Sequence, residues 1–271
     1  TFEVKTEDQA ADISTVLLGV AFYANGDPTR AKQLFDKGLG RLEPSKSDIS
    51  GLEYLYFQRA SVLYGLGQLP DAIADLQQAL KIKDNFEAHY NLAIAYDELC
   101  NPARQLERAI AEAEKAAQMK SSSASAHRLL GDLYHQAGKP AQAIDEFQAA
   151  LKIDPNDAPT HEMLAQAQQA RGQPEAAKKS QATAVALWQK MLATLPVDSL
   201  EARLARGEAA MSTRDYAGAL AEYIAAQKLA PNDPRVQRGL GNAYYRSGNL
   251  GLSVTAYEQW VKLTPNDASA H

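Results

Sequence analysis

The chain has 271 residues, of which 45% are hydrophobic, and 28 basic against 33 acidic side chains give a formal net charge of −5. This length suits one large domain or two small ones, and the composition is sufficient for an apolar core. The mildly acidic balance argues against a dedicated nucleic-acid binder, which usually shows a basic stripe. The single cysteine, Cys100, excludes an intramolecular disulfide and a multi-cysteine metal site.

No apolar run approaches the roughly 20 residues that span a bilayer, and no secretory signal peptide is recognisable. We therefore expect no direct membrane insertion. The first residue is Thr1 rather than methionine, so we expect that something upstream has been removed. The sequence consequently leaves the compartment open, with a cytoplasmic protein and a cell-envelope ectodomain as alternatives.

The N-terminal segment, residues 1–11, differs from the rest of the chain. Residues 1–5 alternate polar and apolar side chains, as a short strand does. Thr6 and Gln9 have the spacing of a capping box, which predicts that a long helix starts here. We interpret the segment as the tail of an upstream domain, and a disordered terminus remains the alternative.

The rest of the chain repeats itself, which is the first property to look for in a sequence. Pro155 and Pro231 are 76 residues apart, and Pro231 and Pro265 are 34 apart. The same two spacings separate three glycines, Gly131, Gly207 and Gly241. Seven repeats follow: 12–45 (with a linker to 52), 53–85, 86–123, 124–157, 158–199, 200–233 and 234–267. Residues 268–271 are predicted to begin a truncated eighth repeat.

The clearest repeat is 124–157, in which apolar and small residues recur every three and four positions and predict two amphipathic helices. The first helix is predicted to end at Gly138, because glycine accepts the left-handed cap conformation without a Cβ clash. Pro140 should open the second helix, where its missing N–H has no consequence. Pro155 then ends that helix.

Small residues recur where the two helices of a repeat are predicted to touch, since a large side chain there would hold them apart. In the first helices these positions hold Gly19, Ala60, Ala93, Gly131, Ala165, Gly207 and Gly241. In the second helices they hold Ala31, Ala72, Ala109, Ala143, Ala177, Ala219 and Ser253. Trp260 is the exception at a later position that is glycine or alanine in the other six repeats.

This pattern resembles the tetratricopeptide repeat (TPR) family. The matching residues are His127-x2-Leu130-Gly131-x2-Tyr134, Ala143-x3-Phe147 and Pro155, and they recur as Gln237-x2-Leu240-Gly241-x2-Tyr244, Ser253-x3-Tyr257 and Pro265. The resemblance covers about residues 12–267. It implies an all-α, right-handed superhelical solenoid of antiparallel helix pairs, with a concave groove lined by the first helices. The near-consensus repeats, rich in alanine and glutamine, are typical of bacterial members.

Three departures from the pattern are local. The third repeat has Cys100-Asn101-Pro102 in place of the turn glycine, and the fifth prolongs its second helix by about two turns, through residues 188–191. The sixth repeat has Arg214 where the glycine would be. Each should change the local pitch of the solenoid without changing the fold.

The sequence contains no motif of an enzyme. G-x-x-x-x-G-K-[ST], G-x-S-x-G and H-E-x-x-H are all missing, so we expect neither catalytic activity nor a cofactor. Four histidines fall in the opening turn of successive first helices: His89, His127, His161 and His271. Equivalent positions in stacked repeats should lie about 10 Å apart, too far for one ion at a Zn–N distance of about 2 Å. We predict that these rings pack rather than bind a metal.

The groove is the predicted site, and the resemblance together with the helical period selects its side chains. They change from apolar and aromatic through acidic to basic along the chain, and an apolar groove suits an amphipathic helix or an extended peptide. The predicted partner-binding residues are Val16, Val20, Tyr23, Tyr54, Phe57, Tyr64, Tyr90, Ile94, Arg128, Asp132, Arg235, Arg238, Asn242 and Tyr245. Among them Tyr54, Phe57 and Tyr90 are the expected aromatic anchors. Alternatively, these apolar residues pack on the first helix, the N-terminal segment or the 43–52 loop.

Three functional hypotheses follow. The leading one is a non-catalytic scaffold that binds a protein or peptide partner, and the second is a regulatory or sensor module of a larger multidomain protein. The third is end-to-end self-association, because solenoids usually finish with a polar capping helix and this one ends in an apolar one. The exposed end is predicted to consist of Val254, Tyr257, Trp260 and Val261, covered by a neighbouring chain or an ordered tail.

Overall fold

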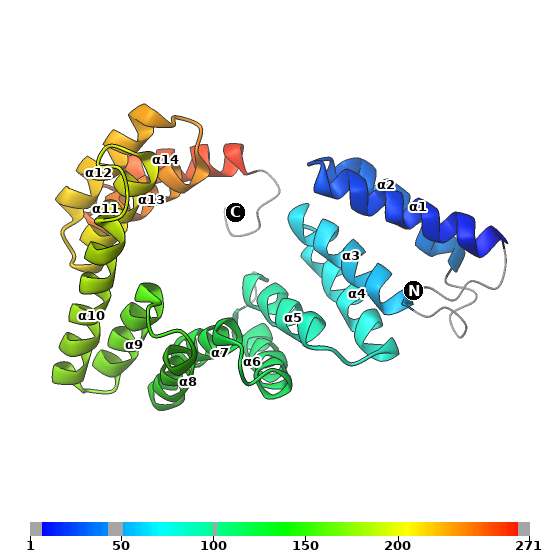
Figure 1. The fold of residues 1–271 in the computed structure, drawn as a ribbon, viewed down its shortest axis with the longest axis horizontal. Coiled ribbons are helices and arrows are strands. Elements are labelled where there is room, and N and C mark those ends of the chain that lie inside the picture. Colours follow the sequence, from blue (N-terminus) through cyan, green and yellow to red (C-terminus); the bar gives the residue numbers. More distant parts are fainter. Residues whose placement is uncertain (1–6, 43–50, 100–101, 265–271) are drawn as a thin grey trace. The chain divides into compact units, whose positions relative to one another are not determined.

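The computed structural model describes residues 7–42, 51–99 and 102–264. Within these ranges the chain is all-α (Figure 1), as the sequence predicted. The helices are α1 (Glu7–Ala24), α2 (Pro28–Leu42), α3 (Leu52–Gly65), α4 (Leu69–Ile82), α5 (Phe86–Glu98), α6 (Pro102–Met119), α7 (Ala124–Gln136), α8 (Pro140–Ile153), α9 (Ala158–Ala170), α10 (Pro174–Leu192), α11 (Leu200–Ser212), α12 (Tyr216–Leu229), α13 (Pro234–Arg246) and α14 (Leu250–Leu263). The predicted N-terminal strand, the linker after the first repeat and the start of an eighth repeat lie outside the described residues.

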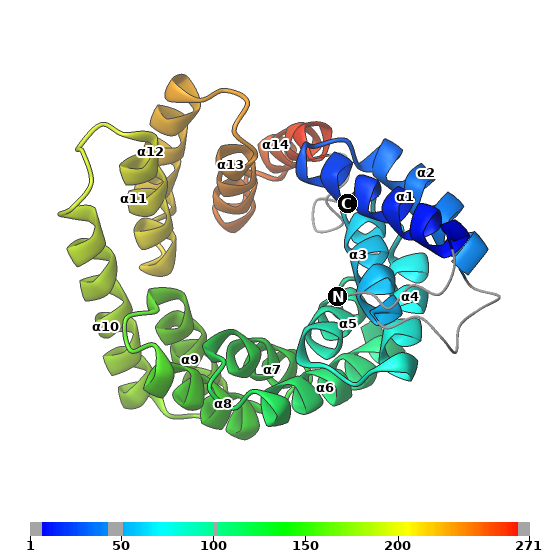
Figure 2. The same ribbon diagram turned by 45° about the vertical axis from the view of Figure 1, so that its right-hand side comes forward.

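Consecutive helices form the pairs that the repeat pattern predicts. Each odd-numbered helix packs along the even-numbered helix that follows it, and the short turn between them makes the two antiparallel. In Figures 1 and 2, α3 and α4 lie side by side, and so do α7 and α8. Among α1 to α6, and again among α7 to α14, the second helix of one pair also packs on the first helix of the next, for example α4 on α5 and α8 on α9. This nearest-neighbour packing is the architecture of a solenoid.

The described helices belong to two compact units. The first unit contains α1 to α6, and the second unit contains α7 to α14. Across the described part of the chain, no helix is long and apolar enough to cross a membrane.

In the six pairs whose turn the structure describes in full, one left-handed residue lies in that turn. Gly138 has a φ of 69°, and its N–H donates to the carbonyl of His135 at 3.1 Å while the N–H of Lys139 donates to that of Tyr134 at 2.9 Å. Four other turns use a glycine in the same way: Gly26, Gly67, Gly172 and Gly248. Arg214 takes this place between α11 and α12 with a φ of 61°, and it is the one non-glycine residue with a positive φ among those described. A side chain in this conformation costs roughly 1–2 kcal/mol.

Helix pairs approach closely where the sequence has small residues. A Cβ built on Gly131 would lie 2.7 Å from the ring of Phe147 in the facing helix. A Cβ on Gly207 would lie 2.5 Å from the ring of Tyr223. In these two pairs the aromatic ring of the second helix therefore packs directly against the small residue of the first helix. The predicted contact is confirmed.

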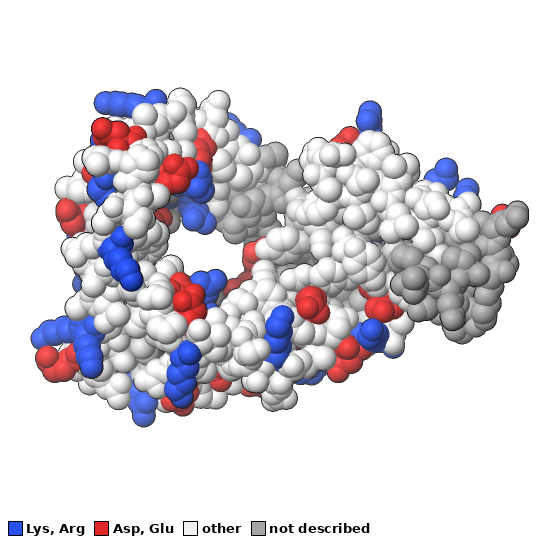
Figure 3. Space-filling view, in the orientation of Figure 1, with Lys and Arg blue, Asp and Glu red and all other residues white. Residues whose placement is uncertain are grey.

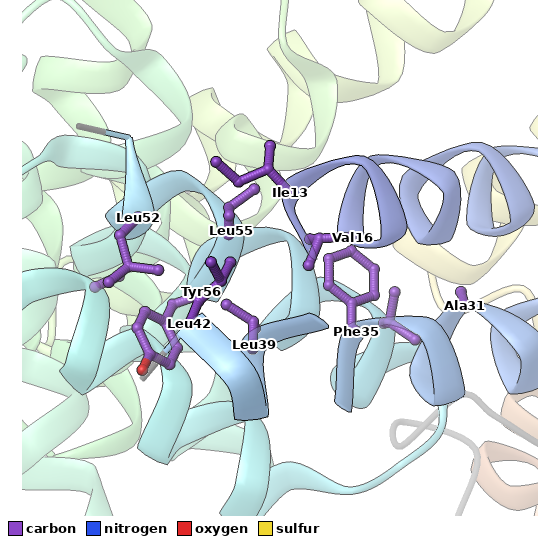
Figure 4. Close-up of a cluster of buried hydrophobic side chains, with 11 residues drawn as sticks. Ile13, Val16, Ala31, Phe35, Leu39, Leu42, Leu52, Leu55 and Tyr56 are labelled. Carbon is purple, nitrogen blue, oxygen red and sulfur yellow. The ribbon is translucent and has the colours of Figure 1, made fainter. Parts of the chain in front are cut away.

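The core of the first unit corrects one prediction (Figure 4). Val16 was expected in the groove, but it is 0% exposed and lies between α1 and α2. It points toward Phe35, and a Cβ on Gly38 would lie 2.4 Å from its methyl group. The sequence missed this because several helical faces of α1 are apolar, and the glycine on α2 decides which of them packs.

The fifth repeat carries the extension that the sequence predicted. Its second helix, α10, has 19 residues and continues through Trp188 before it ends at Leu192. The Trp188 indole N–H donates to Oε1 of Glu162 on α9 at 2.7 Å. The next helix, α11, packs less closely on α10 than α9 does on α8. The extension therefore loosens one junction of the second unit.

Candidate functional site

A small cleft opens on the first-helix face of the first unit, and we call it the apolar cleft. Its volume is about 180 Å³, and α1, α3, α4 and α5 supply its walls. The lining residues are Tyr23, Ala60, Ser61, Tyr64, Leu76, Asn91 and Ile94. The first helices of three successive repeats thus meet at one site, as the resemblance implied for the groove.

Both tyrosines of the apolar cleft are held by their hydroxyl groups. The Tyr23 hydroxyl donates to the carbonyl of Ser61 at 3.2 Å, and that of Tyr64 donates to the carboxylate of Glu98. Gly65 makes room for the first of these rings, since a Cβ there would lie 3.2 Å from the Tyr23 oxygen. With their polar ends bonded to protein, the rings offer apolar surface in fixed positions.

Three predicted groove residues, Tyr23, Tyr64 and Ile94, line the apolar cleft together. The predicted anchors lie elsewhere. Tyr54 is 45% exposed and outside the cleft, and Tyr90 stacks on Phe86 of its own helix with ring centroids 5.7 Å apart.

Phe57 is half-buried outside the apolar cleft, and Val20 is half-buried against the core of the first unit. Sequence reasoning did not assign Ala60, Leu76 and Asn91 to the site. Ala60 carried a usable signal, because small residues on first helices mark close approach. Leu76 carried none, since it comes from a second helix.

The acidic middle of the predicted groove lies in the second unit. Burial raises the pKa of Glu162, and the nearby charge of Glu208 raises it further, although Trp188 and Ser212 donate hydrogen bonds to it. Burial also raises the pKa of Tyr223, and Glu208 adds to the effect. The two carboxylates and the phenol therefore influence one another electrostatically.

Most of the predicted polar groove residues in the second unit already have partners. Arg235 pairs with Asp233 at 2.6 Å, and the Arg238 guanidinium lies 6.0 Å from the centroid of the Trp260 ring. Asn242 accepts a hydrogen bond from the Tyr257 hydroxyl at 2.7 Å. The remaining three are placed as follows: Arg128 pairs with Asp157 at 3.1 Å, Asp132 accepts from Gln136 at 3.2 Å, and Tyr245 is exposed.

The predicted exposed end is partly exposed. On α14, Val254 is 57% exposed, whereas Ile144, its counterpart on α8, is 4% exposed beneath the next repeat. Tyr257, Trp260 and Val261 are half-buried, and the first two rings contact each other at a centroid distance of 6.2 Å. The predicted covering tail lies outside the described residues.

The recurring histidines make separate contacts. His89 is buried between Asp84, at 2.6 Å from Nε2, and Glu112 on its Nδ1 side. His127 contacts Glu146 at 2.6 Å. His161 lies 3.1 Å from the carbonyl of Pro155. No group of three or more potential ligands close enough for a metal ion occurs in the described part of the chain.

Charged side chains of both signs are mixed on one face of the molecule. On the face shown in Figure 3, basic and acidic groups alternate, and neither sign forms a continuous patch. A protein built of stacked antiparallel helix pairs with a cleft on its first-helix face is an α-helical repeat solenoid, and such solenoids present extended binding surfaces.

Family comparison then specifies the kind of solenoid. A profile described as Tetratricopeptide repeat matches residues 103–158, 162–234 and 204–268, more than half of the chain. A profile described as TPR repeat matches 60–99, and a further Tetratricopeptide repeat profile matches 134–186. The chain belongs to the tetratricopeptide repeat family and is a protein–protein interaction scaffold.

Solved structures agree on the fold. The crystal structure of MamA protein aligns with 70% of this chain and 97% of its own at 19% identity, with a TM-score of 0.60. A structure of MamA from Desulfovibrio magneticus RS-1 covers 69% and 98% at 18% identity, with a TM-score of 0.59. A tetratricopeptide repeat protein from Parabacteroides merdae ATCC 43184 covers 96% of both chains at 15% identity, with a TM-score of 0.64. No curated protein matches the sequence.

Proposed function

We propose that the first unit binds a partner protein by taking one apolar side chain of a peptide or helix into the apolar cleft. The observation that carries this proposal is the size and lining of the cleft. An apolar cavity on the order of 150 Å³ binds benzene, and the cleft has about 180 Å³ with two tyrosine rings in its wall. A side chain the size of leucine or phenylalanine fits this volume.

The surroundings of the apolar cleft favour a protein ligand. Its lining includes the amide of Asn91, which offers both a donor and an acceptor to a peptide backbone. Its walls come from three successive repeats, so a ligand that enters it bridges them. Large side chains seated in desolvated pockets commonly dominate the binding energy of an interface.

A substitution tests the proposal directly. Ile94→Glu places a charge in the wall of the apolar cleft and should abolish capture of the partner from the native source. Leu17→Glu is the matched control, because Leu17 is 42% exposed on α1 outside the cleft. Equal capture by both variants would refute the proposal.

A small probe gives an independent test if Ile94→Glu fails to fold. In NMR titrations of the unsubstituted chain, N-acetyl-phenylalanine amide should shift the signals of Tyr64 and Ile94, and N-acetyl-glutamate amide should not. Shifts that are absent, or spread evenly over the surface, would count against an apolar anchor site.

Self-association is a second candidate function, favoured by the exposure of Val254 at a position that the next repeat buries elsewhere. A second copy that packs on α14 would continue the stacking of the repeats. Sedimentation should then show concentration-dependent association, and Val254→Glu should remove it. A monomer at all concentrations would exclude this candidate.

A further inference from the structure

A second and larger cleft lies in the second unit, and we call it the basic cleft. Its volume is about 950 Å³, and its walls come from α7, α9, α10 and the end of α11. The lining residues that the structure describes include no aspartate or glutamate, although the whole chain has a net charge of −5. They do include Lys178, Arg214 and His135. At neutral pH the described lining therefore carries two positive side chains, Lys178 and Arg214, and no negative one.

Part of the lining of the basic cleft is apolar and small, and we call this part the alanine floor. It consists of Ala165 and Ala170 on α9 and Ala177, Ala182, Val185 and Ala186 on α10, the helix on which α11 packs less closely. Four amide side chains also belong to the lining: Gln166, Gln169, Gln181 and Gln189. One of them, Gln181, donates to the carbonyl of Ser212 at 2.9 Å and ties α10 to α11.

Arg214 is the distinctive residue of the basic cleft. It holds a left-handed conformation that glycine provides at the five equivalent turns, and this conformation disfavours any side chain. Strained residues of this kind concentrate at functional sites. Its side chain is exposed, and none of the ion pairs among the described residues includes it. Lys178, by contrast, has an exposed contact with Glu175 at 2.9 Å, a type of pair that stabilises little.

We propose that the basic cleft binds an acidic segment of a partner protein in extended form. Arg214 pairs with a carboxylate of that segment, since its planar guanidinium matches a carboxylate with two parallel hydrogen bonds. The glutamine amides bond to the backbone of the segment, because each carries donors and an acceptor. The alanine floor accepts its small side chains. This site is separate from the apolar cleft in unit, residues and ligand chemistry.

The lining of the basic cleft favours a peptide over a nucleic acid. Single-stranded nucleic acids are bound largely by aromatic side chains on which bases stack. Apart from His135, no aromatic ring is among the lining residues that the structure describes. A partner with small side chains and carboxylates therefore suits the surface better than one with bases and phosphates.

Arg214→Gly separates the proposed role from a structural one. Glycine adopts the left-handed turn without strain, so the variant should melt a few degrees higher than the unsubstituted chain. The probe is a fluorescein-labelled peptide in which glutamate alternates with alanine. We expect saturable, salt-sensitive binding to the unsubstituted chain, and an affinity about tenfold lower for Arg214→Gly.

Three comparisons sharpen this experiment. Arg171→Gly removes another exposed arginine, which lies outside the basic cleft and in a right-handed conformation. Its affinity for the peptide should be unchanged, and its melting temperature should fall slightly rather than rise, because glycine is unfavourable in that conformation. Ala182→Glu adds a carboxylate to the exposed floor and should abolish binding. A lysine–alanine peptide and a labelled oligothymidine should bind more weakly than the acidic peptide.

The opposite results would overturn the proposal. It fails if the acidic peptide shows no saturable binding, or if Arg214→Gly binds as tightly as the unsubstituted chain. Tighter binding of the oligothymidine would assign the basic cleft to nucleic acid instead. Substitution of Ile94 should leave the acidic peptide bound, so the two sites succeed or fail independently.

Discussion

At the scale of single residues, the fold depends on a few contacts that admit no extra atom. The ring of Phe147 packs on Gly131, and the ring of Tyr223 packs on Gly207. In each case a methyl group added to the glycine would lie too close to the ring. Phe147 and Tyr223 are themselves fully buried, so they cannot move aside easily. The small residues that define the repeat pattern are therefore requirements of packing.

Gly131→Ala should consequently destabilise the protein by about 1–3 kcal/mol, as overpacking does. Gly251→Ala in α14 is the control, because no atom lies within 4 Å of a Cβ built there. Alanine in an open helical position should stabilise by up to about 1 kcal/mol. Urea unfolding of both variants measures the two effects, and equal shifts of the two variants would contradict the packing argument.

Glu162 gives a prediction for pH. Its pKa is raised in the folded state by burial and by Glu208, so folding favours the protonated carboxyl. The contribution of this group to stability therefore falls as pH rises from the ordinary glutamate pKa of about 4.3 through the raised value. Glu162→Gln keeps an acceptor for Trp188 without the charge and should be more stable than the unsubstituted protein at neutral pH. Unfolding curves measured over a pH series should converge below about pH 4.

At the scale of elements, the helix pairs could be predicted well because residues close in sequence determine where each helix begins and ends. Turn glycines, prolines at helix starts and capping side chains all act within a few residues, and they recur with the repeat. The orientation of a helix about its own axis depends instead on residues of other helices. Val16 is the example, since the glycine that receives it lies on another helix.

The candidate sites show the same division. Tyr23, Tyr64 and Ile94 could be placed on one face from their period, and the structure adds that they share a cleft with Leu76 of a second helix. The basic cleft could not be predicted, because it depends on how closely α11 packs on the extended α10. The sequence analysis did single out two features of this cleft, the prolonged helix and Arg214. It interpreted both as changes in the pitch of the solenoid and did not predict a binding site there.

The start of α11 offers a test at this scale. The Ser199 hydroxyl accepts the N–H of Ala202 at 3.1 Å and caps the helix. Ser199→Ala should lower the free energy of unfolding by about 1 kcal/mol, whereas Ser199→Asp should keep the cap. Denaturant titrations distinguish the two variants. If both lose the same stability, the hydroxyl is not a significant cap.

At the scale of the whole molecule, the two compact units predict unfolding in separable steps. Both tryptophans, Trp188 and Trp260, lie in the second unit, so tryptophan fluorescence reports on that unit alone. Circular dichroism reports on the helices of both. The two signals together therefore resolve which unit a substitution affects.

Phe35→Ala tests this separation, because Phe35 is fully buried in the core of the first unit. The substitution should cost about 3–5 kcal/mol. Part of the circular dichroism signal should then be lost at lower temperature, while the midpoint of the fluorescence transition stays in place. Coincident shifts of both signals would mean that the units unfold as one.

The left-handed conformation of Arg214 also predicts which substitutions evolution should favour at this position. Every arginine codon becomes a glycine codon by a change of its first base alone, so the less strained residue is one mutation away at this turn. Selection for stability by itself would drive that change to fixation. Lineages in which the basic cleft has lost its partner should therefore carry glycine at this turn, and lineages that keep the partner should keep the arginine.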